Sequence, residues 1–131
     1  MKIEKSYRVP FSVHRVYSAW ISSKTVIAPA TRMDVNPVVG GHYRLFMEAP
    51  EFTAQNEGKF LEVDPQSHLK YTWEWNADGN VTEISVDFEA ADDGTEVRIV
   101  HSGFTDEESR AMHATGWDSY IDGLTQFLKN R

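Results

Sequence analysis

The sequence predicts a single α+β domain, residues 1–131, in which a curved antiparallel sheet of six to seven strands wraps around a long C-terminal helix. Segments of alternating apolar and polar residues follow one another through residues 32–102, separated by short turns. After residue 105 the apolar period changes to that of an amphipathic helix. Short connections favour antiparallel neighbours, and the final helix is long enough to cover the apolar face of the sheet. An apolar cavity is expected between the two.

The N-terminal region predicts one strand followed by two short helices. Lys2–Val9 alternates between apolar and polar side chains, which is typical of a half-buried strand. Ser12 is suited to cap a short helix that ends near Ile21. A second short helical turn is expected around Lys24–Ala28, before Pro29 ends it.

Six further strands are expected, at Arg32–Val35, His42–Glu48, Gly58–Val63, Leu69–Trp75, Val81–Ala90 and Thr95–Ser102. The fourth of these alternates most clearly, and it places Tyr71, Trp73 and Trp75 on one face. Asp-Gly pairs at residues 78–79 and 93–94 are typical of hairpin turns.

The final helix is expected to begin with a capping box between Thr105 and Glu108 and to run for about six turns. Its apolar stripe consists of Met112, Gly116, Trp117, Tyr120, Ile121, Leu124, Phe127 and Leu128. Gly116 and Gly123 lie on or beside this stripe, where each costs about 1 kcal/mol relative to Ala. They either let the helix approach the sheet or leave room for a ligand.

Composition excludes several classes of function. The chain has no cysteine, which excludes disulfides, thiolate metal sites and cysteine nucleophiles and favours a cytoplasmic location. Its five histidines show no i, i+4 pair, so we expect no metal and no cofactor. A net charge of −7 without a basic run argues against nucleic acid and anionic membrane surfaces as partners. We expect neither a signal peptide nor a transmembrane segment.

Short motifs are distributed over nearly the whole chain: Val16–Trp20, Gly40–Arg44, Gly58–Pro65, Tyr71–Trp75, Gly94-Thr95, His101–Phe104, and His113 with Gly116-Trp117. In this order and spacing they resemble the SRPBCC (START-like) superfamily, in the branch similar to the activator of heat-shock protein 90 ATPase. The resemblance implies the helix-grip (START-like) fold, with a cavity between the sheet and the long helix. Because members include ligand carriers, cyclase-like enzymes and chaperone cofactors, it implies no single activity.

Aromatic side chains from the sheet and the final helix are expected to converge on this cavity. The candidate ligand-binding residues are Tyr43, Tyr71, Trp73, Trp75, Phe88, His101, Met112, His113, Trp117 and Tyr120. A pocket lined by rings with a few polar groups is the usual form of a small-molecule site. Rings also fill ordinary cores, and the sequence does not choose between the two arrangements.

His101 is the one weak candidate for a catalytic residue. It shares the inward face of its strand with Val97 and Ile99, and a buried imidazole can act as a general acid or base. The alternative is a neutral histidine that is hydrogen-bonded within the core, since no inward carboxylate accompanies it.

Three functions follow from these observations. The first is binding of an unidentified hydrophobic or amphipathic small molecule. The second is a cyclase-like or hydratase-like enzyme that uses His101, and the missing partner for this histidine favours binding over catalysis. The third, implied by the resemblance, is a cofactor of a chaperone ATPase. A homodimer through an edge strand such as Lys2–Val9 is also consistent with the sequence.

Overall fold

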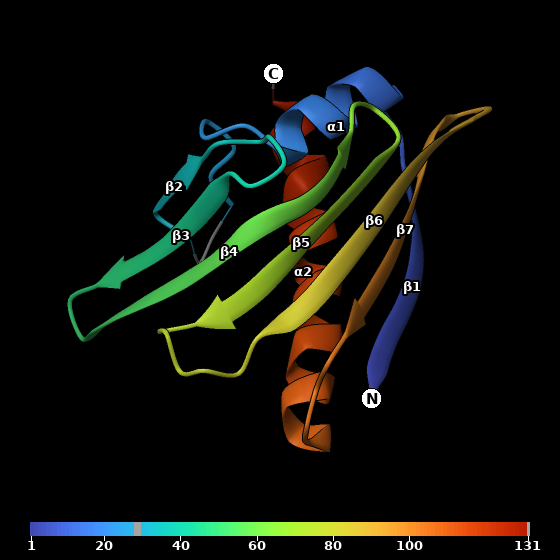
Figure 1. Cartoon of the computed structure of the whole chain (residues 1–131). Coiled ribbons are helices and arrows are strands. Elements are labelled where there is room, and N and C mark those ends of the chain that lie inside the picture. The colour runs from blue at the N-terminus through green and yellow to red at the C-terminus, as the bar shows by residue number, and fades with distance from the viewer. Residues whose placement is uncertain (28–29, 131) are drawn as a thin grey trace.

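Seven antiparallel strands form one curved sheet in the computed structural model, which describes residues 1–27 and 30–130. The strands are β1 (Lys2–Val9), β2 (Arg32–Val35), β3 (His42–Ala49), β4 (Phe52–Asp64), β5 (His68–Trp75), β6 (Thr82–Ala91) and β7 (Gly94–Ser102). Their order across the sheet is β1-β7-β6-β5-β4-β3-β2, so β1 and β2 are the edges (Figure 1). The predicted sheet and its antiparallel pairing are confirmed.

Strand β4 is longer than the predicted strand at Gly58–Val63, because it already begins at Phe52. Its N-terminal half carries Ala54 and Asn56 at the inward positions. A small residue and a polar one give almost no apolar alternation, so periodicity alone misses this half. Further along, the pairing with β5 shifts register between Phe60 and Glu62. Such an extra residue bends a strand, and it contributes to the curvature of the sheet.

Two helices complete the fold of the described residues. Helix α1 (Val13–Trp20) is capped by Ser12, whose hydroxyl accepts the N–H of Arg15, as predicted. Helix α2 (Glu107–Lys129) has 23 residues, which confirms the predicted length of about six turns. The N-cap of α2 lies one residue after the predicted Thr105.

The residue that caps α2 is Asp106, whose carboxylate accepts the N–H of Ser109 at 2.7 Å. The predicted capping box between Thr105 and Glu108 is therefore wrong. Aspartate is at least as good a cap as threonine, and the helix starts one residue later than the motif suggested.

The second short helix expected around Lys24–Ala28 is also wrong over the residues that the structure describes. The chain makes one turn, in which the N–H of Thr25 donates to the carbonyl of Ser22 at 3.1 Å, and then continues without helix through residues 25–27. Three consecutive β-branched residues occupy these positions, and they lose side-chain freedom in a helix. Ala28 lies outside the described residues.

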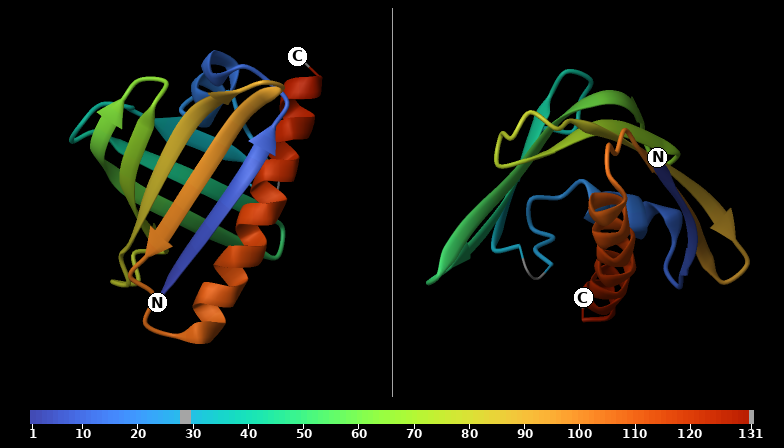
Figure 2. Two further views of the ribbon diagram at one scale, coloured as in Figure 1. Left: turned by 90° about the vertical axis from the view of Figure 1, so that its right-hand side faces the viewer. Right: turned by 90° about the horizontal axis from the view of Figure 1, so that it is seen from below.

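The long helix α2 lies along the concave face of the sheet, with α1 beside it (Figure 2). The core consists of inward side chains of the strands and the buried stripe of α2, among them Val9, Leu69, Ile84, Val86, Val97, Ile99, Ile121 and Leu124. Lys5 and Tyr7 of β1 both donate to the carboxylate of Asp118, at 2.8 and 2.6 Å. These bonds fix the helix against the edge strand.

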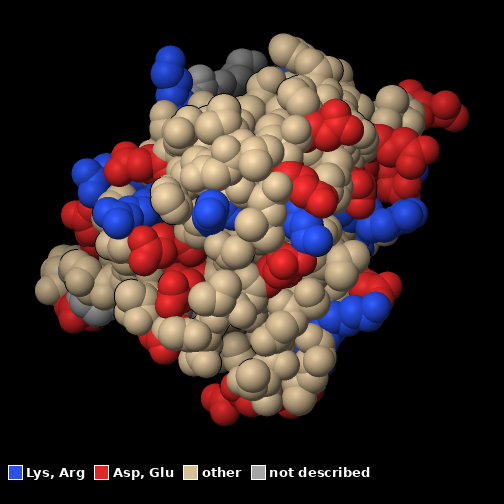
Figure 3. Space-filling view, in the orientation of Figure 1, with Lys and Arg blue, Asp and Glu red and all other residues tan. Residues whose placement is uncertain are grey.

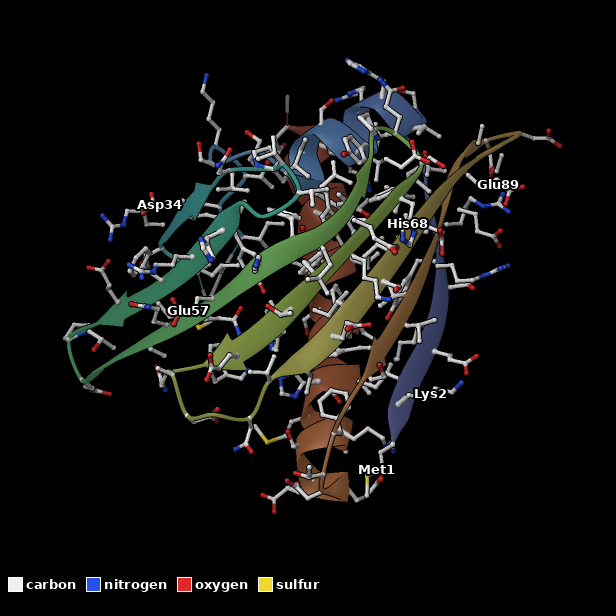
Figure 4. All side chains as sticks on the ribbon, in the orientation of Figure 1. Met1, Lys2, Asp34, Glu57, His68 and Glu89 are labelled. Carbon is white, nitrogen blue, oxygen red and sulfur yellow. The ribbon has the colours of Figure 1, made fainter. Side chains whose placement is uncertain are left out.

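The convex face of the sheet is the charged one. Acidic and basic side chains are interspersed over it (Figure 3). Glu57 and His68 lie on this side of the sheet (Figure 4). The fold thus separates an outer charged face from an inner apolar one, which determines the chemistry of the site described next.

Candidate ligand-binding site

An apolar cavity of about 460 Å³ lies between the sheet, helix α2 and the segment that connects α1 to β2. This volume is within the range of small-molecule sites. Its lining comprises Trp20, Thr25, Ile27, Ala30, Met33, Val35, Tyr43, Leu45, Met47, Phe60, Tyr71, Trp73, Trp75, His101, Met112, His113, Gly116, Trp117, Ser119 and Tyr120. The sheet arches over α2 (Figure 2), and most of the strand residues that line the cavity belong to β2–β5.

The structure brings nine of the ten predicted ligand-binding residues to this cavity: Tyr43, Tyr71, Trp73, Trp75, His101, Met112, His113, Trp117 and Tyr120. The tenth, Phe88, is buried elsewhere. Its ring packs edge-on against Tyr17 at 5.3 Å and Trp20 at 5.5 Å, under helix α1. Met112 is 68% exposed, which places it at the rim of the cavity.

Sequence reasoning missed the wall formed by the connecting segment, including Thr25 and Ile27. It also missed Trp20 at the end of α1. Two other missed residues, Leu45 and Met47, share their strand face with Tyr43, and this alternation was a usable signal.

His101 is fully buried, and both of its ring nitrogens are engaged. The indole N–H of Trp117 donates to its Nδ1 at 3.1 Å. Its Nε2, which therefore carries the proton, lies 2.7 Å from the hydroxyl of Thr82, and that hydroxyl donates in turn to the carbonyl of Trp73 at 3.3 Å. Burial, with a smaller contribution from His113, lowers the pKa of His101 to about 3. The geometry is that of a neutral core histidine.

His113 joins the first turns of α2 to strand β5. Its Nδ1 donates to the carbonyl of Ser109 at 2.7 Å, within the helix. Its Nε2 then accepts two indole N–H groups, from Trp73 at 3.2 Å and from Trp75 at 3.0 Å. One imidazole thus orients two tryptophan rings at one end of the cavity.

All four tryptophans of the chain line the cavity. The remaining two are also satisfied within the protein: Trp117 donates to His101, and Trp20 donates to the hydroxyl of Tyr71 at 3.2 Å. Since every indole N–H is bound internally, the tryptophans offer only their apolar ring surfaces to a ligand.

The hydroxyl of Tyr43 is also engaged. It lies 2.8 Å from the carbonyl of Thr72 and 3.1 Å from Oδ1 of Asn56, and its single proton serves these acceptors. Burial raises the pKa of Tyr43 well above its usual value. The Nδ2 of Asn56 is buried without a hydrogen-bond partner among the described residues, which costs on the order of 1–3 kcal/mol of stability.

The two helix glycines have different roles. A Cβ at Gly123 would lie 2.4 Å from Cγ2 of Ile27, so this glycine allows the connecting segment to pack closely against α2. A Cβ at Gly116 would meet no atom within 4 Å, and Gly116 lines the cavity. Gly123 therefore allows a close approach, made to the connecting segment rather than to the sheet, whereas Gly116 adds open space to the cavity; room for a ligand at Gly116 stays a prediction.

The cavity lining contains no Lys, Arg, Asp or Glu among the residues that the structure describes. The described residues also hold no cluster of three or more His, Asp or Glu side chains suited to a metal ion. Among the described residues, neither α1 nor α2 is long and apolar enough to span a membrane. The site is an uncharged, ring-lined space with a few hydroxyl groups.

Comparison with known proteins identifies the family. Solved structures with the same fold include an AHSA1-like protein from Aeromonas hydrophila (20% identity, TM-score 0.85, covering 99% of this chain and 93% of that one). A protein from Chromobacterium violaceum is similar (19%, 0.83, 96% and 95%), and so is the Aha1 dimer from Colwellia psychrerythraea (18%, 0.77, 95% and 93%). The search of curated proteins found no match.

The family model described as Activator of Hsp90 ATPase homolog 1-like protein matches residues 10–129, which is almost the whole chain. The chain therefore belongs to this family, a member of the SRPBCC superfamily.

Proposed function

We propose that this protein binds a hydrophobic or amphipathic small molecule in the cavity between the sheet and helix α2. The observation that carries the proposal is the uncharged cavity of about 460 Å³, lined by all four tryptophans of the chain. An ordinary core is packed to a density that leaves few voids larger than a water molecule. Apolar side chains that line a cavity make fewer packing contacts than those of a close-packed core, and a bound apolar molecule adds such contacts.

The rigidity of the lining supports the same proposal. Trp73, Trp75 and Trp117 are each fixed by a hydrogen bond to a histidine, so their rings are already oriented before a ligand arrives. A pre-oriented wall loses little side-chain entropy on binding, which favours affinity.

The experiment is a fluorescence titration with N-phenyl-1-naphthylamine, an uncharged dye that becomes fluorescent in apolar surroundings. We expect one dye molecule per chain, quenching of tryptophan emission, and a rise in melting temperature with dye concentration. The matched variant is Gly116→Phe, whose side chain has open space at Cβ and projects into the cavity. It should fold and fail to bind. Dye binding that is equal in wild type and Gly116→Phe would contradict the proposal.

The enzyme alternative has less support, because a general base needs a free nitrogen and both nitrogens of His101 are hydrogen-bonded.

The role as a chaperone ATPase cofactor stays a prediction, for which a pull-down with the purified chaperone is the test. A homodimer also stays a prediction. The edge strands β1 and β2 are the places where sheets of two copies would join, and light scattering after size exclusion measures this.

A further inference from the structure

Two phenol groups are the distinctive polar groups of the cavity. Tyr120 lines the cavity, and its hydroxyl has no hydrogen-bond partner among the described residues. The oxygen of Tyr71 accepts the indole N–H of Trp20, but the proton of Tyr71 has no acceptor in the described part of the chain. The other rings of the cavity have no N–H or O–H to offer, because those of Tyr43 and of the four tryptophans are bound within the protein.

The two phenols belong to one region of the cavity. The ring of Trp20 packs edge-on against Tyr120 at 5.0 Å, and its N–H reaches Tyr71. Burial raises the pKa of Tyr120 far above its usual value, and the neighbouring Tyr71 contributes to this shift. Burial raises the pKa of Tyr71 as well. Both groups therefore remain protonated and act as hydrogen-bond donors toward a ligand.

The charge of the ligand follows from the lining. An ion moved into an apolar site without a counter-charge loses its hydration, at a cost that far exceeds the gain from packing. The described lining offers no Lys or Arg to an anion and no Asp or Glu to a cation. His101 and His113 have both ring nitrogens engaged in hydrogen bonds within the protein, so neither ring offers a free N–H to an anion.

We propose that the ligand is an uncharged molecule whose carbonyl or ether oxygen accepts hydrogen bonds from Tyr71 and Tyr120, while its apolar body lies against the tryptophan rings. This inference rests on the proposed function. The hydroxyls of Thr25 and Ser119 also line the cavity, and each can donate or accept. They do not distinguish a donor from an acceptor on the ligand, whereas the oxygen of Tyr71 already accepts the N–H of Trp20 and leaves its proton to be donated to an acceptor.

The test compares three probes of similar size as competitors of N-phenyl-1-naphthylamine. Fluorene is a hydrocarbon, fluorenone adds one carbonyl oxygen, and fluorene-9-carboxylate carries a negative charge. We expect fluorenone to displace the dye about tenfold better than fluorene, because a hydrogen bond to a buried donor is added. Fluorene-9-carboxylate should compete less well than fluorene.

The variants are Tyr120→Phe and Tyr71→Phe, with Tyr17→Phe as the matched control. Tyr17 is a tyrosine of α1 whose ring packs on Phe88 and does not line the cavity. Each cavity variant should weaken fluorenone by about threefold to tenfold and leave fluorene unchanged. Tyr120→Phe removes a hydroxyl that has no partner among the described residues, so this variant should fold even if Tyr71→Phe, which leaves Trp20 unpaired, does not. The carbonyl stretching frequency of bound fluorenone should be lower in wild type than in Tyr120→Phe.

The outcomes separate the two proposals. If the dye does not bind to wild type, the proposed function fails. If the dye binds but fluorenone competes no better than fluorene, or both phenylalanine variants weaken the two probes equally, the inference about the ligand fails and the binding function stands. Preference for fluorene-9-carboxylate would also overturn the inference.

Discussion

The indole N–H of Trp117 donates to Nδ1 of His101 over 3.1 Å, and this bond joins helix α2 to strand β7. Because Nδ1 accepts, the proton of the neutral ring is on Nε2, which faces the hydroxyl of Thr82. The tryptophan thereby fixes both the position and the tautomer of the histidine. The residue that the sequence singled out for catalysis is, in the structure, part of the support of the cavity wall.

This arrangement predicts acid sensitivity caused by His101. In the folded protein the pKa of His101 is lowered to about 3, whereas a histidine in the unfolded chain titrates near pH 6.5. Between these values the unfolded chain binds a proton that the folded chain does not, so stability falls as pH falls from about 6.5 toward 3. His101 contributes at most about 1.4 kcal/mol per pH unit to the slope of the unfolding free energy against pH.

The measurement is urea unfolding of wild type and His101→Gln across this pH range. Glutamine keeps one donor and one acceptor but does not titrate. The variant should be less stable at neutral pH, by about 1–3 kcal/mol, and should lose less stability on acidification. Parallel pH profiles for the two proteins would show that His101 is not responsible.

The two helix glycines predict opposite effects of the same substitution. Gly116→Ala places a methyl group in open space and should stabilise the protein by about 1 kcal/mol through helix propensity. Gly123→Ala gains the same propensity but forces Ile27 to move, at a cost of about 1–3 kcal/mol. Chemical unfolding of the two variants should therefore differ by at least about 1 kcal/mol. Equal stabilisation of both would show that Ile27 does not pack on Gly123.

His68, on the outer face, predicts the opposite pH dependence to His101. Partial burial lowers the pKa of His68, but hydrogen bonds to Glu62 and Asp87, each 2.8 Å long, outweigh this effect and raise the pKa above its usual value. The protonated ring therefore adds stability below about pH 6.5, and this contribution is lost as pH rises through the higher folded pKa.

The effect of His68 should be small, because the two carboxylates are more than half exposed. An NMR titration of the His68 ring should give a pKa above that of a free histidine. His68→Gln should reduce stability more at mildly acidic pH than at alkaline pH. A His68 pKa at or below the free value would contradict the observed geometry.

Much of the fold could be predicted because its signals are local. Strand β5 alternates strictly, and the stripe of α2 keeps its period from Trp117 to Leu128. The misses share a physical cause. In the first half of β4 the inward positions hold Ala54 and Asn56, and at residues 25–27 a β-branched run follows a turn, so neither segment shows a periodic apolar pattern.

The cavity was predictable only in part, because alternation assigns a residue to a face but not to a region of that face. Phe88 and Trp73 both point inward, yet α1 covers Phe88 and leaves Trp73 beside the cavity. The wall formed by Thr25 and Ile27 depends on the contact between Ile27 and Gly123, which are far apart in sequence. Such a contact leaves no periodic signal in a single sequence.

The most direct test of ligand binding in this cavity uses the four indole N–H signals in a ¹H–¹⁵N NMR spectrum. Because all four tryptophans line the cavity, saturation with N-phenyl-1-naphthylamine should shift all four signals and leave the backbone amide of Glu89, in β6 and away from the lining, in place (Figure 4). In Gly116→Phe the dye should shift none of them. Unchanged indole signals in wild type, or shifts confined to the outer face of the sheet, would contradict the account.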